Sequence, residues 1–141
     1  EAPVYISWSA SNRSALIRVP AARGMATRVE LRSSDPSCNP YLEMALCIAA
    51  GLDGIKKGMK APEGITTNIY DMTREERKAN GIENLPSTLQ EATREFEKSE
   101  FVKDVLGEHI FSKYLAGKKQ EWESYTTRIT QWEIEEYLTK Y

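Results

Sequence analysis

The sequence contains few cysteine and histidine residues, the side chains that form disulfides and zinc sites. It has two cysteines, Cys38 and Cys47, and one histidine, His109, in 141 residues. No Cys-x-x-Cys pair or His/Cys cluster accompanies them, which argues against a disulfide framework and against a zinc site. We expect the cysteines to be buried free thiols and His109 to have a structural role. No apolar run is long enough to span a bilayer, so we expect no membrane partner.

Lysine is absent from residues 1–32, although this segment carries five arginines. With two acids, the segment has a balance of +3, so the remainder carries −5 within the net charge of −2. The planar fork of arginine matches two oxygens of a phosphate or carboxylate at once. Nucleic-acid surfaces usually combine lysine with arginine and use more of them. A compact anionic ligand therefore fits this segment better than nucleic acid.

An initiator methionine and a signal-peptide pattern are also missing from the first residues. The chain opens on Glu1-Ala2-Pro3 and passes at once into a strand-like run. We interpret this start as a cut inside a longer chain. The length suits one domain with a modest core.

Strand patterns come first along the chain, and helix patterns follow, which predicts an α+β fold. β-forming residues with alternating polarity predict antiparallel strands over residues 4–9, 16–19 and 27–33. In the third strand the alternation is strict. Arg28, Glu30 and Arg32 therefore share one face of it.

Two helix starts are marked by capping residues. Asn39 followed by Pro40 predicts a helix over residues 41–55. That helix is mostly apolar, so we expect it to be buried on most sides. Thr73, with Glu76 three residues later, predicts a capping box on a short helix.

The last third of the chain has a helical pattern. Residues 87–98 predict an amphipathic helix, and residues 108–141 a helical C-terminal tail. Gly107 should interrupt the helical pattern before the tail. The run 126–130 is poor in helix-forming residues and predicts a kink within it.

The charged face of the third strand has two interpretations. A glutamate between two arginines is common on a solvated edge strand, where salt bridges contribute little. Alternatively, the arginines hold anions while Glu30 either neutralises them or holds a metal. Arg18 and Arg13 favour the second interpretation, because Arg13 lies in a polar loop between two strands, a usual place for binding residues. The residues alone predict a phosphate- or carboxylate-binding sheet face, with the metal left open.

Motifs along the chain resemble class I glutamine synthetase in order and spacing. The resemblance covers nearly the whole chain and is most specific in the first 42 residues. The matching motifs are Glu1-Ala2-Pro3, Ser9-Ala10-x-Asn12-Arg13-Ser14, Leu16-Ile17-Arg18-Val19-Pro20, Thr27-Arg28-Val29-Glu30-Leu31-Arg32-Ser33 and Asp35-Pro36-x-x-Asn39-Pro40-Tyr41-Leu42.

The resemblance implies an enzyme that phosphorylates glutamate with ATP and displaces the phosphate with ammonia, through γ-glutamyl phosphate. It implies that Arg13 contacts the transferring phosphoryl group, and so touches both ATP and glutamate. Arg18 and Arg28 would hold the nucleotide phosphates. Such chemistry is mostly positioning and charge neutralisation, which arginines and a metal supply.

Three further roles follow from the same resemblance. Glu30 would be one ligand of a Mg²⁺ or Mn²⁺ ion that bridges the phosphates. Arg32 would bind on the glutamate side of the phosphoryl group. Glu1 matches the catalytic glutamate of a flap that closes over the intermediate and touches the glutamate substrate. Water must be excluded there, because an acyl phosphate hydrolyses readily.

The resemblance also implies the organisation of the parent protein. Residues 1–141 would be the C-terminal part of the catalytic domain, with active-site strands and loops in residues 1–35 and mainly helices in residues 36–141. The strands would belong to a larger catalytic sheet or barrel. The parent would be cytoplasmic and form two stacked hexameric rings, with the tail from Glu108 on the opposite ring. Because other metal ligands lie upstream in the family, the fragment alone should be inactive.

Two alternatives remain open. A relative that ligates glutamate to another amine would share the same residues for ATP and glutamate. The match through the late helices favours the synthetase over such a relative. A non-enzymatic α+β interaction module with a charged sheet face is the third hypothesis.

Overall fold

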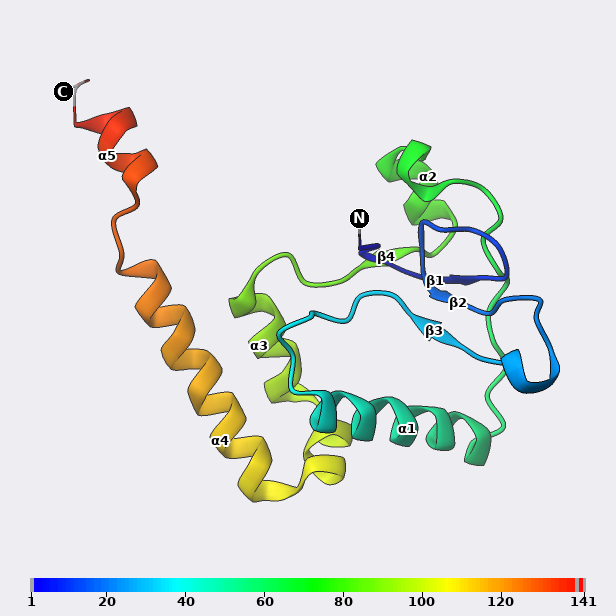
Figure 1. The fold of residues 1–141 in the computed structure, drawn as a ribbon. Coiled ribbons are helices and arrows are strands. Elements are labelled where there is room, and N and C mark those ends of the chain that lie inside the picture. Colours follow the sequence, from blue (N-terminus) through cyan, green and yellow to red (C-terminus); the bar gives the residue numbers. More distant parts are fainter. Residues whose placement is uncertain (1, 139, 141) are drawn as a thin grey trace. The chain divides into compact units, whose positions relative to one another are not determined.

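The computed structural model describes residues 2–138 and residue 140 of the chain. These residues form two compact units, residues 1–87 and residues 88–141 (Figure 1). All strands lie in the first unit, and the second is helical. The predicted α+β class is confirmed.

A four-stranded sheet forms the first unit's centre. Its strands are β1 (Tyr5–Ser9), β2 (Ala15–Arg18), β3 (Glu30–Leu31) and β4 (Glu83–Asn84), in the order β3-β2-β1-β4. The three strands predicted near the N-terminus are present, the third much shortened. The fourth strand comes from a distant part of the sequence and was not predicted.

The sheet is mixed, whereas its N-terminal strands were expected to be antiparallel. β2 pairs antiparallel with β3, and β1 pairs antiparallel with β4, but β1 and β2 are parallel. The connection between β1 and β2 is short, and it runs back beside β1 so that Tyr5 pairs with Ala15. Five residues can span roughly 17 Å, which is enough to return along so short a strand. The polar loop 10–14 is therefore a tight crossover and not a hairpin turn.

A small core lies between the sheet and the segment that follows α1. Its apolar side chains are nearly inaccessible to water: Pro3, Ala15, Leu16, Ile69 and Ile82. Ile69 begins a 3-10 turn, η2 (Ile69–Asp71), which Asn68 caps. Burial of these side chains supplies the hydrophobic stabilisation of the unit.

The helices of the first unit begin at the predicted caps. In α1 (Pro40–Lys56), the Asn39 side chain accepts hydrogen bonds from the first turn. In α2 (Arg74–Ala79), Thr73 and Glu76 form the predicted capping box. A second 3-10 turn, η1 (Gly24–Ala26), lies between β2 and β3.

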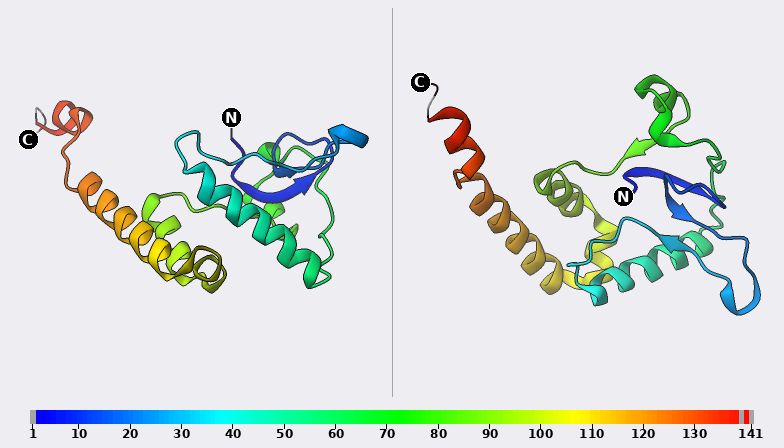
Figure 2. Two further views of the ribbon diagram at one scale, coloured as in Figure 1. Left: turned by 60° about the horizontal axis from the view of Figure 1, so that its bottom comes forward. Right: turned by 45° about the horizontal axis from the view of Figure 1, so that its top comes forward.

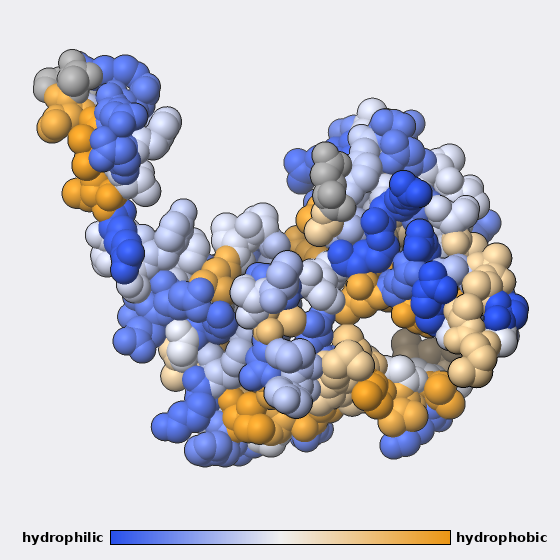
Figure 3. Space-filling view, viewed as in Figure 1, coloured by the Kyte–Doolittle hydropathy of each residue, from blue (hydrophilic) through white to orange (hydrophobic). Residues whose placement is uncertain are grey.

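The prediction that α1 is buried on most sides is wrong for this chain. No residue of α1 is buried, and its apolar stripe is exposed at Tyr41 (84%), Met44, Ile48, Leu52 and Ile55 (77%). Figure 3 shows hydrophobic surface along the lower edge, where Figure 1 places α1 in the same view. The short sheet offers no broad apolar face to cover them, so the apolar pattern finds no partner among the described residues.

The second unit consists of α3 (Leu89–Lys98), α4 (Glu100–Thr126) and α5 (Gln131–Tyr137). Gly107 has φ 72° and breaks the helical geometry inside α4, as predicted. The ring of Phe96 in α3 stacks on Phe111 in α4 at 5.0 Å between centroids. The predicted kink is a full break between α4 and α5 (Figure 2).

The cysteines are free thiols, as predicted, but they are not buried. Cys38 is partly exposed and Cys47 is exposed. Cys47 lies on α1, so its exposure has the same cause as that of the apolar stripe. Within the described residues, no helix has the length and apolar character needed to cross a membrane.

Candidate functional site

Three of the predicted site residues form one ion-paired cluster on neighbouring strands. The Glu30 carboxylate uses one oxygen for each arginine. Its Oε2 atom lies 2.7 Å from Nε and 2.6 Å from Nη2 of Arg18, and its Oε1 atom lies 2.8 Å from Nε of Arg28. Glu30 thus holds two guanidinium groups about one carboxylate.

Backbone register places this cluster. Arg18 and Glu30 are direct partners across the antiparallel β2–β3 pair, and Arg28 precedes Glu30 by two residues, on the same face. The hydrogen bond from Arg18 lowers the pKa of Glu30, and that from Arg28 adds to the effect. The same bond raises the pKa of Arg18. The cluster is partly exposed to water, so its paired arginines remain accessible to an anion.

The other two predicted arginines meet through the backbone. Arg32 donates a hydrogen bond from Nη1 to the main-chain carbonyl oxygen of Arg13. Arg32 follows β3, and its backbone N–H donates to the carbonyl oxygen of Leu16 in β2. The pairing of β2 with β3 therefore places Arg32 beside the crossover loop. The five residues thus form two groups on β2, β3 and the adjoining loops: Arg18, Arg28 and Glu30 in one, and Arg13 and Arg32 in the other.

Two polar residues beside Arg13 were quoted in a motif, but no role was predicted for them. Asn12 and Ser14 tie the crossover loop to residues 65–69, more than 50 positions away. Ser14 is almost fully buried. The sequence Asn-x-Ser signals a local turn, but nothing in it indicates the distant segment that it holds.

The described residues do not form a complete metal site. Among them there is no group of three His, Cys, Asp or Glu side chains that could hold a metal ion. Glu30 supplies one carboxylate, and both of its oxygens accept hydrogen bonds from arginines. Mg²⁺ takes several oxygen ligands, so these residues alone do not fit it. Glu1, predicted to be catalytic, lies outside the described residues, and His109 is exposed on α4.

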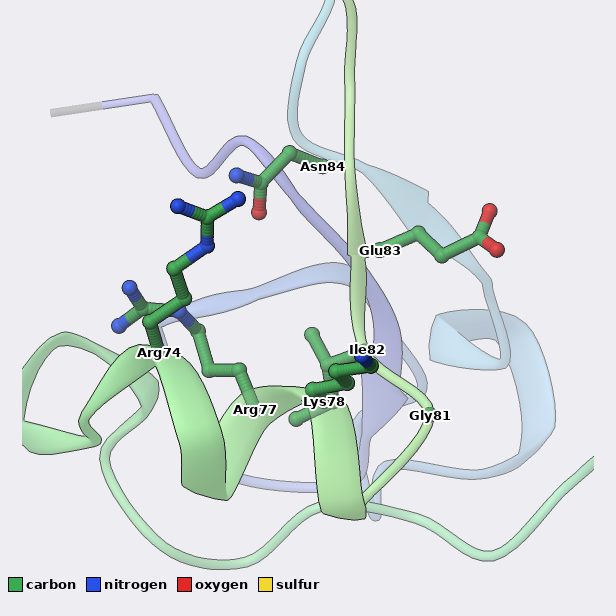
Figure 4. A pocket seen from close by; sticks show the side chains of 7 residues that line it. All are labelled: Arg74, Arg77, Lys78, Gly81, Ile82, Glu83 and Asn84. Carbon is green, nitrogen blue, oxygen red and sulfur yellow. The ribbon is translucent and has the colours of Figure 1, made fainter.

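A hollow of about 440 Å³ lies between α2 and β4, away from this cluster (Figure 4). Arg74, Arg77 and Lys78 line it from α2, and Glu83 and Asn84 from β4. Figure 4 shows the Glu83 side chain directed away from the arginines. None of the predicted site residues lines this hollow.

Comparison with known proteins agrees with the motifs. Residues 1–137 match the family described as glutamine synthetase, catalytic domain. Over all 141 residues, the chain is 55% identical to glutamine synthetase of Clostridium saccharobutylicum and 50% identical to that of Staphylococcus aureus (strain MW2). It covers 32% of the length of each of these relatives.

A solved structure, apo GmaS without ligand, has the same fold. It superposes with a TM-score of 0.81 at 32% sequence identity, covering 98% of this chain and 31% of that chain. The sheet with its arginines thus lies in a chain that matches this catalytic-domain family over residues 1–137. The chain belongs to the glutamine synthetase catalytic-domain family.

Proposed function

We propose that this chain works as the C-terminal part of the catalytic domain of a glutamine synthetase, residues 1–35 supplying active-site strands and loops. The whole enzyme would make glutamine from glutamate, ammonia and ATP through γ-glutamyl phosphate. The observation that carries the proposal is the pairing of Arg18 and Arg28 with Glu30, together with the contact of Arg32 with the Arg13 carbonyl on the loop before β2, in a chain of this family.

Arg18 and Arg28 are proposed to bind the phosphates of ATP. Their guanidinium groups are held by Glu30 and keep N–H donors free for phosphate oxygens, since each guanidinium has five. Arg13 is proposed to be a catalytic residue that contacts the transferring phosphoryl group, and thus both substrates. Its side chain is exposed, and a phosphoryl transfer is accelerated mainly by such positioned positive charge.

Arg32 and Glu1 are proposed to act on the glutamate side. Arg32 lies next to Arg13 through its hydrogen bond to the Arg13 carbonyl, so both arginines can approach one substrate. Glu1 is proposed to belong to a closing flap and to bind glutamate. Both proposals rest on the motifs that these residues match.

Glu30 is also proposed to be one ligand of a Mg²⁺ or Mn²⁺ ion. Because the described residues supply a single carboxylate at this position, the remaining ligands are proposed to come from the rest of the enzyme. A divalent ion there would neutralise phosphate charge. If the metal ion displaced one of the arginines from Glu30, the negative charge of the carboxylate would still be neutralised.

The organisation of the whole enzyme is proposed from the same family. We propose a cytoplasmic homo-oligomer of two stacked hexameric rings, in which the helical tail beyond Glu108 contacts the opposite ring. The exposed aromatic residues Trp132 and Tyr137 of α5 suit such a contact. Neither nucleic acid nor a membrane is proposed as a partner.

The test is an assay of the full-length synthetase that carries this sequence. It should release phosphate from ATP only when glutamate is present, and form glutamine with ammonia but little product with methylamine or polyamines. Equal or faster reaction with another amine would identify a relative with a different acceptor. Purified residues 1–141 should show no synthesis at any metal concentration, and activity there would contradict the proposed division of the site.

A further inference from the structure

We propose that Asn12 and Ser14 are positioning residues for Arg13, acting as a clamp that fixes the crossover loop against residues 65–69. This inference rests on the proposed function, because the position of Arg13 matters for turnover only if Arg13 contacts the transferring phosphoryl group. It assigns a role to two side chains whose polar atoms are engaged in hydrogen bonds within the fold.

The carboxamide group of Asn12 bonds both to Ser14 and to the segment 65–69. Its Nδ2 atom donates to the main-chain oxygens of Ile65 at 3.1 Å and Thr67 at 2.6 Å. Its Oδ1 atom accepts from the backbone N–H of Ser14 at 2.9 Å and from the Ser14 hydroxyl at 2.7 Å. The residues on both sides of Arg13 are therefore bound to each other, and the loop is bound to the distant segment.

Ser14 completes the clamp from inside the protein. Its hydroxyl donates to Asn12 and accepts from the backbone N–H of Ile69 at 2.9 Å. Both Ser14 and Ile69 are buried, so this hydrogen bond is shielded from competing water and fixes the loop firmly.

Arg13 itself depends on this support. Among the residues that the structure describes, no hydrogen bond or ion pair holds the Arg13 guanidinium, and only its carbonyl is engaged, by Arg32. The position of the Arg13 side chain is therefore set by the backbone of the loop, and Asn12 and Ser14 fix that backbone. A charge that must meet a transition state benefits from such preorganisation.

A purely structural clamp would lower stability without a specific effect on turnover, so the test must separate the two. Asn12→Asp is the informative substitution, since it keeps the acceptor for Ser14 and removes the two donors to residues 65 and 67. Asn80→Asp is the matched control. Asn80 donates from Nδ2 to the carbonyl of Glu76 at the end of α2, so the same chemical change is made away from the arginines.

The experiment measures kcat, the KM for ATP and the thermal midpoint in the full-length enzyme, for each variant alone and combined with Arg13→Ala. We expect Asn12→Asp to lower kcat roughly 10- to 100-fold, because a displacement of about 1 Å has such an effect. The KM for ATP should change less than about threefold, as for the loss of a contact made mainly in the transition state. Ser14→Thr, which keeps the hydroxyl, should retain most activity, and Asn80→Asp should match the unmodified enzyme.

The double variants decide the matter. If Asn12 acts through Arg13, adding Asn12→Asp to Arg13→Ala should lower kcat little further. Additive losses, or an unchanged kcat in folded Asn12→Asp, would overturn the inference. If Asn12→Asp does not fold, Ser14→Ala carries the same test, and failure of both to fold would show a folding element instead of a positioning one. An unaffected kcat in Arg13→Ala alone would refute the proposed role of Arg13 itself, which is a different result.

Discussion

Arg18 and Glu30 face each other across the β2–β3 pair, and two nitrogens of the Arg18 guanidinium lie 2.6 and 2.7 Å from the same carboxylate oxygen. The other oxygen of Glu30 is left for Arg28. This division leaves Glu30 with two potential roles in the enzyme, as the counter-ion of two arginines and as a metal ligand. Substitutions at this position can distinguish them.

The metal role of Glu30 predicts a length dependence. Glu30→Asp in the full-length enzyme should raise the Mg²⁺ or Mn²⁺ concentration needed for activity, because a ligand must reach about 2.0–2.2 Å and the shorter side chain falls short. Glu30→Gln should nearly abolish activity. Metal titration of each variant is the measurement. If both variants titrate like the unmodified enzyme while ATP affinity falls, Glu30 is only the counter-ion of the arginines.

The arginine pairing of Glu30 predicts a pH effect on stability. Its pKa is lowered, chiefly by the hydrogen bond from Arg18, so the unfolded chain binds this proton more readily. The pair therefore stabilises the fold above the ordinary glutamate pKa of about 4.3, and this stabilisation is lost as the pH falls through the lower folded value. Denaturant unfolding between neutral and acid pH should show a shallower loss of stability in Glu30→Gln. The exposed Glu63→Gln variant is the control, and equal slopes in all three proteins would contradict the prediction.

Arg13 should affect turnover more than nucleotide binding. A positive charge needed mainly as charge develops on the phosphoryl group acts in the transition state, so Arg13→Ala should lower kcat roughly 100-fold, the effect of removing one oxyanion donor. The affinity for ATP should change much less. Steady-state kinetics and equilibrium nucleotide binding measure the two quantities. Normal turnover with a raised KM for ATP alone would make Arg13 a ground-state contact.

The aromatic contact between α3 and α4 should carry much of the stability of the second unit. The Phe96 ring lies 5.0 Å from Phe111 and 5.2 Å from Tyr114 between centroids. Since Phe96 is only partly buried, Phe96→Ala should lower the unfolding free energy by about 2–3 kcal/mol, at or below the lower end for buried phenylalanine. Ile129→Ala, at a residue 77% exposed, should change it by less than about 0.5 kcal/mol. Comparable losses of unfolding free energy in Phe96→Ala and Ile129→Ala would show that the aromatic contact does not stabilise the second unit specifically.

The apolar stripe of α1 predicts a difference between the isolated chain and the full-length enzyme. Ile48 is 58% exposed, so Ile48→Glu should change the unfolding free energy of residues 1–141 by no more than about 0.5 kcal/mol. In the full-length enzyme we expect a larger loss, because a helix so apolar is normally buried. Denaturant unfolding of both proteins makes the comparison. An equally small effect in the full-length enzyme would show that the stripe stays exposed there.

Local features of the sequence determined the ends and breaks of the elements. Asn39 and Thr73 cap the helices that they were predicted to cap, because a capping side chain bonds within three residues. Gly107 interrupts α4 because glycine alone tolerates its positive φ at no cost. The contact of Arg28 with Glu30 also follows from the sequence, since strand alternation puts the two residues on one face.

Tertiary structure alone decided which distant groups meet. The parallel pairing of β1 and β2, the fourth strand from residues 83–84 and the hydrogen bonds from Asn12 to residues 65 and 67 all join segments whose pairing leaves no periodic trace in the sequence. The exposure of α1 has the same origin. A hydrophobic pattern indicates that a helix face is suited to burial. Burial itself needs a partner surface, and the small sheet does not provide one for α1.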